Sequence, residues 1–212
     1  MRLRAADQTT LLIDPYNPGG FGGRMGYAPI PYLADAVVCS HGHADHAALG
    51  DLKNAPHLIE GDGGFGPFAV RRHRAFHDEY GGRRRGGAVD ILEIRVDGWR
   101  VVHLSDVGHS PTPALVAALR APDILCVPVG GNFTIGAAQA FEWWQRLGPR
   151  RCIPIHAKTP RCGLELQRSD IFEAYFPADF CAASPPGTHS FIELDSAMIT
   201  FEECITVLAS EC

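Results

Sequence analysis

The sequence lacks a long uninterrupted hydrophobic run, and this absence excludes the usual signature of a membrane-spanning helix. Its longer apolar stretches, such as residues 121–129, are interrupted by proline and aspartate. The first residues contain no apolar segment that could form the core of a signal peptide. We therefore expect a cytoplasmic protein that does not bind a membrane.

Several other sequence signals are also missing. No run of five or more basic residues occurs and the net charge is -5, so nothing indicates binding to nucleic acid. The 7 cysteines include no C-x-x-C pair, and their odd number argues against a closed disulfide framework. Two glycine-rich loops, residues 17–26 and 81–87, lack the strand–glycine–helix context of a nucleotide-binding fingerprint. A small-molecule substrate is the partner that we expect.

Length and composition are those of an ordinary globular domain. The chain has 212 residues, of which 46% are hydrophobic and 20% are charged. That length suffices to bury a full hydrophobic core. We expect a single domain that spans residues 1–212.

Short apolar runs bounded by glycine, proline and aspartate predict many strands and few helices. The expected strands are residues 10–13, 36–39, 57–59, 68–73, 89–96, 100–104, 124–127, 152–155, 191–194, 198–201 and 205–208. The expected helices are residues 112–120, 136–147 and 169–176, with a further helix beginning at residues 47–49. Asp97-Gly98 between two apolar runs predicts a tight hairpin. The mixture favours a mixed α/β fold over a doubly wound parallel sheet.

The segment that follows the apolar run 36–39 has the pattern H-x-H-x-D-H. Residues two apart in an extended segment point the same way, so His41 and His43 can bind one metal ion. Asp45 and His46 lie where we expect a helix to begin, which directs them to a second position nearby. Imidazole and carboxylate groups suit zinc, manganese or iron. The alternative is a histidine-rich surface loop, which so dense a cluster makes the weaker interpretation.

Three more candidate ligands occur where a predicted strand meets a turn, a common position for functional side chains: His77, Asp106 and His156. His73 would share a face with His77 in a helix, but the predicted strand favours His77 alone. His109 lies three residues after Asp106 and competes as a ligand. We interpret His109 as a pocket or structural residue.

Six segments, taken in chain order, resemble motifs of the metallo-β-lactamase-fold hydrolases. The similarity is greatest to the branch that contains ascorbate-6-phosphate lactonase and related metal-dependent hydrolases. The matching segments are Leu11-Leu12-Ile13-Asp14-Pro15 and residues 40–46, 75–77, 105–108, 128–136 and 153–156. Ser105 and Val107 depart from the glycine and threonine that flank the aspartate in the family's turn.

The resemblance implies an α/β fold, a four-layer αββα sandwich with the site at the open edge between two sheets. It implies one metal ion on His41, His43 and His77, a second on Asp45, His46 and His156, and Asp106 bridging the two. It also implies that the family's opening strand is missing, which leaves an edge of the N-terminal sheet unpaired. Exposed edges tend to be covered, so we expect a homo-oligomer.

The function that these residues predict is hydrolysis with two divalent metal ions, zinc or manganese and otherwise iron. Two such ions can activate a water molecule against a small ester, lactone or phosphoester. Asp45 is expected to bind metal and to accept the proton of that water. Two alternatives stay open: a non-catalytic or vestigial metal-binding member of the fold, and a diiron redox protein.

Substrate-binding residues are predicted in the loops around the ligands. The arginine run that contains Arg84 is either a solvated loop or an anion-binding lid. Lys158 follows His156 by two residues and can face an anionic substrate group, as can His109 from its own loop. The turn at Asn132 either offers backbone N–H groups to an anion or is a tight strand-to-helix connection. The expected substrate is therefore an anionic small molecule.

Overall fold

The computed structural model describes residues 1–176, together with the backbone of residues 181–183 and 204–207. The strands predicted at residues 191–194 and 198–201 lie outside the described residues.

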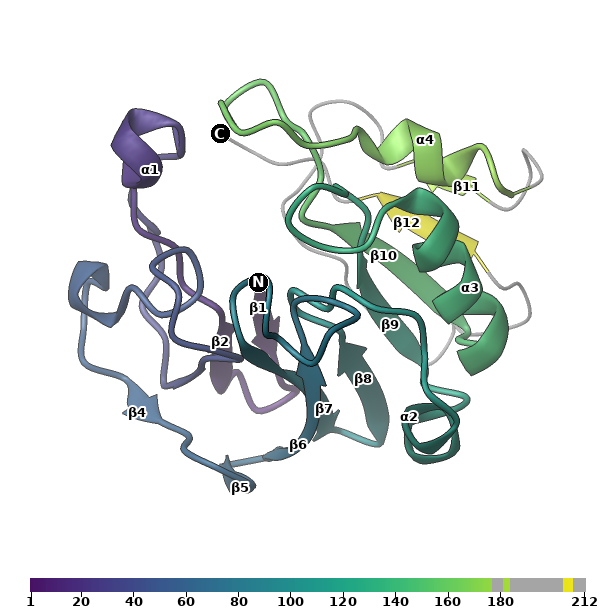
Figure 1. Cartoon of the computed structure of the whole chain (residues 1–212). Helices are drawn as coiled ribbons and strands as arrows, with labels where there is room; N and C mark the ends of the chain where they lie inside the picture. The colour runs from purple at the N-terminus through teal and green to yellow at the C-terminus, as the bar shows by residue number, and fades with distance from the viewer. Residues whose placement is uncertain (177–180, 184–203, 208–212) are drawn as a thin grey trace.

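Two mixed β-sheets form the frame of the molecule (Figure 1). The smaller sheet has the order β1-β2-β3-β4, with β1 antiparallel to β2 and the other pairs parallel. Its strands are β1 (Arg2–Arg4), β2 (Thr10–Ile13), β3 (Ala36–Val38) and β4 (His57–Leu58). The larger sheet has the order β11-β12-β10-β9-β8-β7-β6-β5. Its strands are β5 (Gly63–Phe65), β6 (Phe68–Phe76), β7 (Ala88–Val96), β8 (Trp99–His103), β9 (Ile124–Pro128), β10 (Arg151–Ile155), β11 (Cys181–Ala183) and β12 (Cys204–Val207).

Three helices cover the outer face of the larger sheet (Figure 1). They are α2 (Pro113–Leu119), α3 (Ala137–Leu147) and α4 (Ser169–Glu173). The helix predicted at 112–120 begins as expected, because Thr112 accepts a hydrogen bond from the backbone N–H of Leu115 and proline follows as the first helical residue. Trp143 of α3 is fully buried against this face of the sheet. No helix in the described part of the chain is long and apolar enough to cross a membrane.

The smaller sheet has a different outer layer. Loops cover it, with only the irregular turn α1 (Gly20–Gly23) and the 3-10 turn η1 (Leu49–Asp51). Residues 15–34 are rich in proline and glycine, which disfavour a helix. The prediction that a helix begins at residues 47–49 is wrong. The N–H of Ala48 donates a hydrogen bond to the carbonyl oxygen of Pro15 and makes no bond within a helix. Within the described residues, the expected αββα arrangement therefore has a regular helical layer on one side.

Alternating side chains divide the core into layers. In β2, Leu11 and Ile13 face the core between the two sheets, whereas Leu12 packs outward against Ile30. In β7, Leu92 belongs to the core between the sheets. Successive side chains of a strand point to opposite faces, so neighbouring residues of β2 enter different layers of the core. The apolar side chains of this core thus hold the two sheets face to face.

The predicted strands between residues 10 and 155 are all present, with shifted ends. The hairpin is confirmed, because Val96 pairs with Trp99, and Asp97 and Gly98 have φ values of 50° and 83°, as in a type I′ turn. Three of the described strands were missed, β1, β5 and β11. A strand does precede β2, and β1 has β2 as its one neighbour among the described strands, so it forms an edge of the smaller sheet.

A buried carboxylate ties α2 to the larger sheet. Glu93 of β7 accepts hydrogen bonds from Arg100 (2.8 Å) and His73 (3.0 Å). The guanidinium of Arg100 also donates to the carbonyl oxygens of Ala118 (2.8 Å) and Arg120 (2.7 Å) at the end of α2. Burial favours the neutral acid, but the hydrogen bonds from Arg100 and His73 outweigh it and hold the pKa of Glu93 at about 2.

Glu93 should therefore contribute to acid sensitivity. Its pKa is lowered from 4.5 to about 2, so its contribution to stability is complete above pH 4.5 and is lost as the pH falls towards 2. We expect Glu93→Gln to cost about 1–3 kcal/mol at pH 7 and to flatten the pH dependence between 4.5 and 2. Urea unfolding at several pH values, with the exposed Glu60→Gln as control, measures both effects. Equal pH profiles for wild type and Glu93→Gln would contradict this role.

Candidate functional site

The predicted ligands gather at one edge of the molecule because the strands that carry them end there. β2 and β3 are parallel, and β8, β9 and β10 are parallel. β6 is antiparallel to β7, as is β8, so β6 ends on the same side as β8. The H-x-H-x-D-H segment follows β3, and His77, Asp106 and His156 follow β6, β8 and β10.

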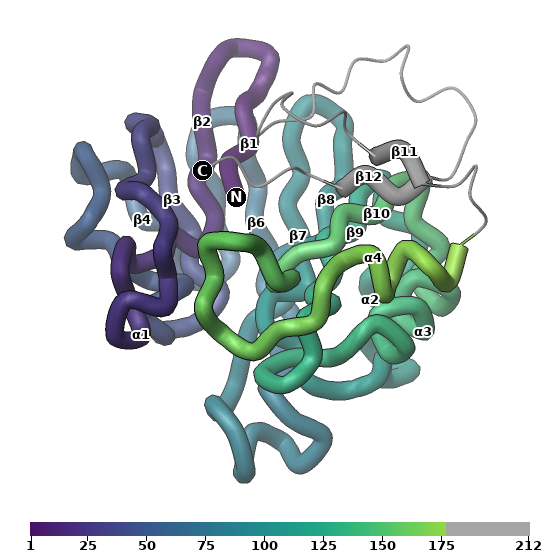
Figure 2. Tube along the Cα trace, turned by 90° about the horizontal axis from the view of Figure 1, so that it is seen from above, coloured from purple at the N-terminus to yellow at the C-terminus, as the bar shows by residue number. Residues whose placement is uncertain are grey.

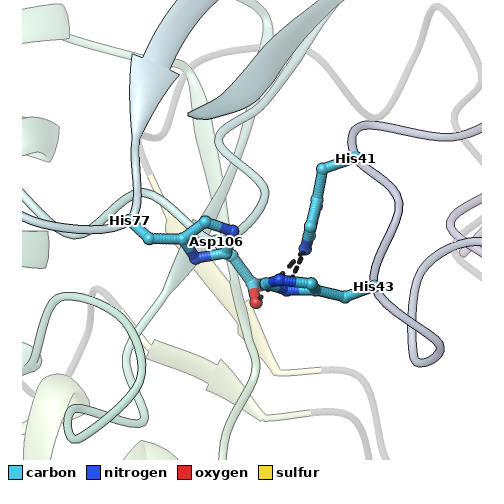
Figure 3. Close-up of side chains that lie close together, drawn as sticks. All are labelled: His41, His43, His77 and Asp106. Atoms are coloured by element: carbon cyan, nitrogen blue, oxygen red, sulfur yellow. Dashed lines mark hydrogen bonds and ion pairs between the residues drawn. The ribbon is translucent and has the colours of Figure 1, made fainter. Parts of the chain in front are cut away.

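The first cluster combines three imidazoles and a carboxylate: His41, His43, His77 and Asp106. One ligand atom from each lies within 4.8 Å of the others, and Figure 3 shows the four side chains directed towards one another. Nε2 of His41 is 3.0 Å from Nδ1 of His43 and 3.9 Å from Oδ2 of Asp106. His41 and His43 lie in a bend and not in an extended segment, so the predicted convergence is present for a different local reason.

The second cluster comprises Asp45, His46, Asp106 and His156. Nε2 of His46 is 3.2 Å from Oδ1 of Asp106 and 3.5 Å from Oδ2 of Asp45. Nε2 of His156 is 3.8 Å from Oδ2 of Asp106. Asp106 therefore belongs to both clusters, and the structure brings together all of the residues that the sequence predicted as ligands.

The chemistry of these donors fits a metal ion. Nε2 of His77 and Nδ1 of His156 are buried without a hydrogen-bond partner among the described residues. Buried polar atoms normally have partners, and a cation would satisfy these. Nitrogen and oxygen donors of this kind suit zinc, manganese or iron.

The electrostatics of the clusters also favour a cation. Burial, with the nearby His46, lowers the pKa of His41 to about 3, so its ring is neutral, the form that binds metal. Burial opposes protonation of His46, but the carboxylates of Asp106 and Asp14 outweigh it and raise the pKa of His46 to about 11. Burial would raise the pKa of Asp106, but the surrounding histidines, His156 first, hold it far below its usual value. The clusters thus hold an ionised carboxylate that attracts positive charge.

A second layer of hydrogen bonds supports the ligands. Asp14, directly after β2, accepts hydrogen bonds from the backbone N–H of Ser40 (2.6 Å), from its hydroxyl group (2.7 Å) and from Nδ1 of His46 (2.9 Å). Ser40 Oγ also lies 2.9 Å from Nδ1 of His41. Such contacts orient a ligand ring and raise its basicity. Neither Asp14 nor Ser40 was predicted to support a ligand, although both follow directly on predicted strands.

The side chains of two predicted substrate-binding residues, Lys158 and Asn132, bind the loop of residues 158–167. Nζ of Lys158 donates to the carbonyl oxygens of Cys162 and of Leu164, the latter at 2.7 Å. Nδ2 of Asn132 donates to the carbonyl oxygen of Glu165 at 3.1 Å. Both polar groups therefore bind the backbone of residues 158–167. This loop reaches the N-terminal half, where Met25 pairs with Cys162 (Figure 2).

His109 lies outside both clusters. Its Nδ1 is 2.8 Å from the carbonyl oxygen of Ser110, and its Nε2 accepts the backbone N–H of Phe76 at 3.4 Å. Trp143 donates to its carbonyl oxygen at 2.9 Å. His109 is 9% exposed, and these contacts give it a structural place under α3.

The arginine loop, residues 78–87, lies against the first cluster. Asp78 accepts hydrogen bonds from the backbone N–H groups of residues 80, 82, 84 and 85 at 2.7–2.8 Å, and these bonds fix the shape of the loop. Gly86 has φ +59°, and a Cβ there would lie 2.7 Å from the ring of His77 and 3.1 Å from that of His43. Only glycine allows this approach.

Two arginines of the arginine loop lie near aromatic rings. The guanidinium of the exposed Arg84 is 3.7 Å from the ring centroid of Tyr80, and that of Arg85 is 6.0 Å from the centroid of Phe133. Tyr80 and Phe133 are 44% and 40% exposed. The arginine loop thus carries cationic groups that lie beside exposed aromatic rings.

Comparison with known proteins agrees with this geometry. The sequence matches the family described as "Beta-lactamase superfamily domain" over residues 1–156. A UPF0173 metal-dependent hydrolase of Desulforamulus reducens is 29% identical over 183 residues, which cover 72% of this chain and 78% of the relative. A UPF0173 metal-dependent hydrolase of Methanoregula boonei is 29% identical over 173 residues, covering 70% and 75%.

Solved structures show the same fold. A candidate Zn-dependent hydrolase of the metallo-β-lactamase superfamily from Thermotoga maritima has a TM-score of 0.71 and 28% identity, with 95% of this chain and 90% of the other covered. A possible metal-dependent hydrolase from Veillonella parvula, at 17% identity, has a TM-score of 0.60 and covers 82% of this chain and 87% of the other. The fold predicted from the sequence is therefore confirmed.

Proposed function

This chain belongs to the beta-lactamase superfamily domain family. We propose that it is a hydrolase that uses two divalent metal ions, zinc or manganese. Its proposed substrate is a small anionic ester, lactone or phosphoester. The predicted class, a metal-dependent hydrolase of the metallo-β-lactamase superfamily, agrees with its relatives. One observation carries the proposal of two ions: the carboxylate of Asp106 is common to both ligand clusters. The finer resemblance to the ascorbate-6-phosphate lactonase branch stays a prediction, as do the cytoplasmic location and the homo-oligomer.

The clusters divide the chemical tasks among their residues. His41, His43 and His77 would hold one ion, Asp45, His46 and His156 the other, and Asp106 both. Metal ions at these positions would supply a nucleophile from water near neutral pH and polarise the scissile bond. The side chain of Asp45 is 13% exposed and that of Asp106 is 6% exposed. Asp45 is therefore the carboxylate better placed to take a proton from a water molecule.

The arginine loop supports an anionic substrate. The loop passes next to His77 and His43 at Gly86. Arg84 and Arg85 directly precede this glycine, so their backbone lies near the first cluster. A guanidinium group binds carboxylate and phosphate oxygens in a fork. The exposed rings of Tyr80 and Phe133 would contact the apolar part of a small substrate. These features favour a substrate with one anionic group and one ring or chain.

The residues of the two clusters disfavour both alternatives, the diiron redox protein and the vestigial site. The redox proteins of this fold resemble H-x-E-x-D, whereas His43 occupies the glutamate position here. A vestigial site would lose ligands, but all of the predicted ligands are present.

We test the function by elemental analysis followed by a panel of phosphoesters, lactones and thioesters in matched anionic and neutral forms. We expect about two ions per chain and turnover of anionic members. Arg84→Ala and Arg85→Ala should raise KM for anionic substrates about 10-fold with little change in kcat. Exposed Lys53→Ala is the matched control. Metal binding without any hydrolysis would favour a vestigial site, and protein that takes up no metal would contradict the proposal.

A further inference from the structure

Ser105 is a buried serine in a backbone conformation that favours glycine. It lies directly before Asp106, is 0% exposed and has φ 54°, which residues with a Cβ rarely adopt. Its backbone N–H donates to Nδ1 of His103 at 3.2 Å. Strained backbone tends to persist where the surrounding structure holds it in place. The contacts of the Ser105 hydroxyl group identify what holds it here.

The hydroxyl groups of Ser105 and Ser40 form a chain that ends on Asp14. Ser105 Oγ is 2.5 Å from Ser40 Oγ, and Ser40 Oγ is 2.7 Å from Oδ2 of Asp14. An ionised carboxylate only accepts hydrogen bonds. The Ser40 hydroxyl therefore donates to Asp14, and the Ser105 hydroxyl donates to Ser40. This order fixes the direction of both protons.

The same order determines which nitrogen of His41 carries a proton. Ser40 Oγ is 2.9 Å from Nδ1 of His41. Because the single O–H of Ser40 donates its hydrogen bond to Asp14, Nδ1 of His41 is the donor in the contact with Ser40 Oγ. The free lone pair of the ring then lies on Nε2, which faces His43 and Asp106 in the first cluster.

We propose that Ser105 is a positioning residue for metal binding, which acts through Ser40 to hold His41 with Nε2 free for an ion. The inference rests on the proposed function, since it needs the first cluster to bind metal. Glycine at position 105 would adopt the same backbone without strain but would lack the hydroxyl group. The serine therefore adds backbone strain and a hydrogen bond that supports a ligand.

Zinc titration of the metal-free protein against a competing chelator tests this role. Hydrogen bonds behind a metal ligand typically contribute about 10–100-fold to affinity, so Ser105→Gly should weaken zinc binding at least about 10-fold. Its unfolding midpoint without metal should change little, because relief of strain offsets the lost hydrogen bond. Ser105→Ala should lose the same affinity and also stability. Ser110→Ala, whose hydroxyl binds Glu142 outside the clusters, should bind zinc as wild type does.

A double variant shows whether Ser105 acts through Ser40. Ser40→Ala with Ser105→Gly should lose no more zinc affinity than Ser40→Ala alone, since both changes break one chain. Wild-type affinity in Ser105→Gly, or additive losses in the double variant, would overturn the positioning role. A wild-type protein that binds no zinc would instead overturn the proposed function.

Discussion

Replacing Asp106 with alanine is expected to empty both metal positions and to abolish hydrolysis. The carboxylate contributes to both clusters, with Oδ1 3.2 Å from His46 and Oδ2 3.9 Å and 3.8 Å from His41 and His156. Metal ions contribute several kcal/mol to the stabilisation of a transition state, so turnover should fall by about 10³-fold or more. Elemental analysis after gel filtration should show far less than the wild-type metal content.

The control for this experiment is Asp170→Ala, which removes an exposed carboxylate outside the clusters. It should leave metal content and turnover unchanged. Asp106→Ala protein that still held two ions per chain would show that each cluster binds its ion without the shared carboxylate. The proposal of a bridged site would then be wrong.

The second large effect is expected at Asp45, where metal binding and proton transfer can be separated. Asp45→Asn keeps an oxygen that can bind metal but removes the charge and the capacity to take a proton. We expect most of the metal to stay and the activity to fall about 10²–10⁴-fold, the usual contribution of a positioned acid or base. His46→Ala removes a ligand and should lose metal and activity together.

Near-full turnover in Asp45→Asn would mean that another group takes the proton. His109 is one candidate, since it follows Asp106 by three residues. Both ring nitrogens of His109 contact the backbone, and the residue lies outside both clusters. His109 is therefore poorly placed to take the proton.

The convergence of the candidate ligands could be predicted from the sequence, because each one lies after the end of a strand. The local pattern around His77, Asp106 and His156 was enough, once the parallel strands placed their ends at one edge. The supporting residues were missed because their partners are distant in sequence. The chain from Ser105 to Ser40 spans 65 positions, and no local pattern reports such a contact.

The same limit explains features of the loops that the sequence did not predict. Lys158 carries an ammonium group suited to an anion, but this group binds carbonyl oxygens within its own loop, those of Cys162 and Leu164. The side chain of Asn132 binds the carbonyl oxygen of Glu165, 33 positions later. The helix expected after Asp45 was predicted from the helix propensity of the local residues. In the structure the N–H of Ala48 instead donates a hydrogen bond to the carbonyl oxygen of Pro15, in the loop after β2. The contacts of Asn132 and Ala48 join distant parts of the chain, and such contacts override local preference.

Ligands from both sheets make the metal site a late product of folding. His41 follows β3 of the smaller sheet, whereas His156 follows β10 of the larger one. Such widely separated segments meet only after the loop between them has closed, a step whose entropic cost rises with its length. A chain still emerging from the ribosome cannot complete the second cluster until β10 has been made. Metal uptake should therefore follow the packing of the two sheets against each other. A bound ion would then stabilise the packed state.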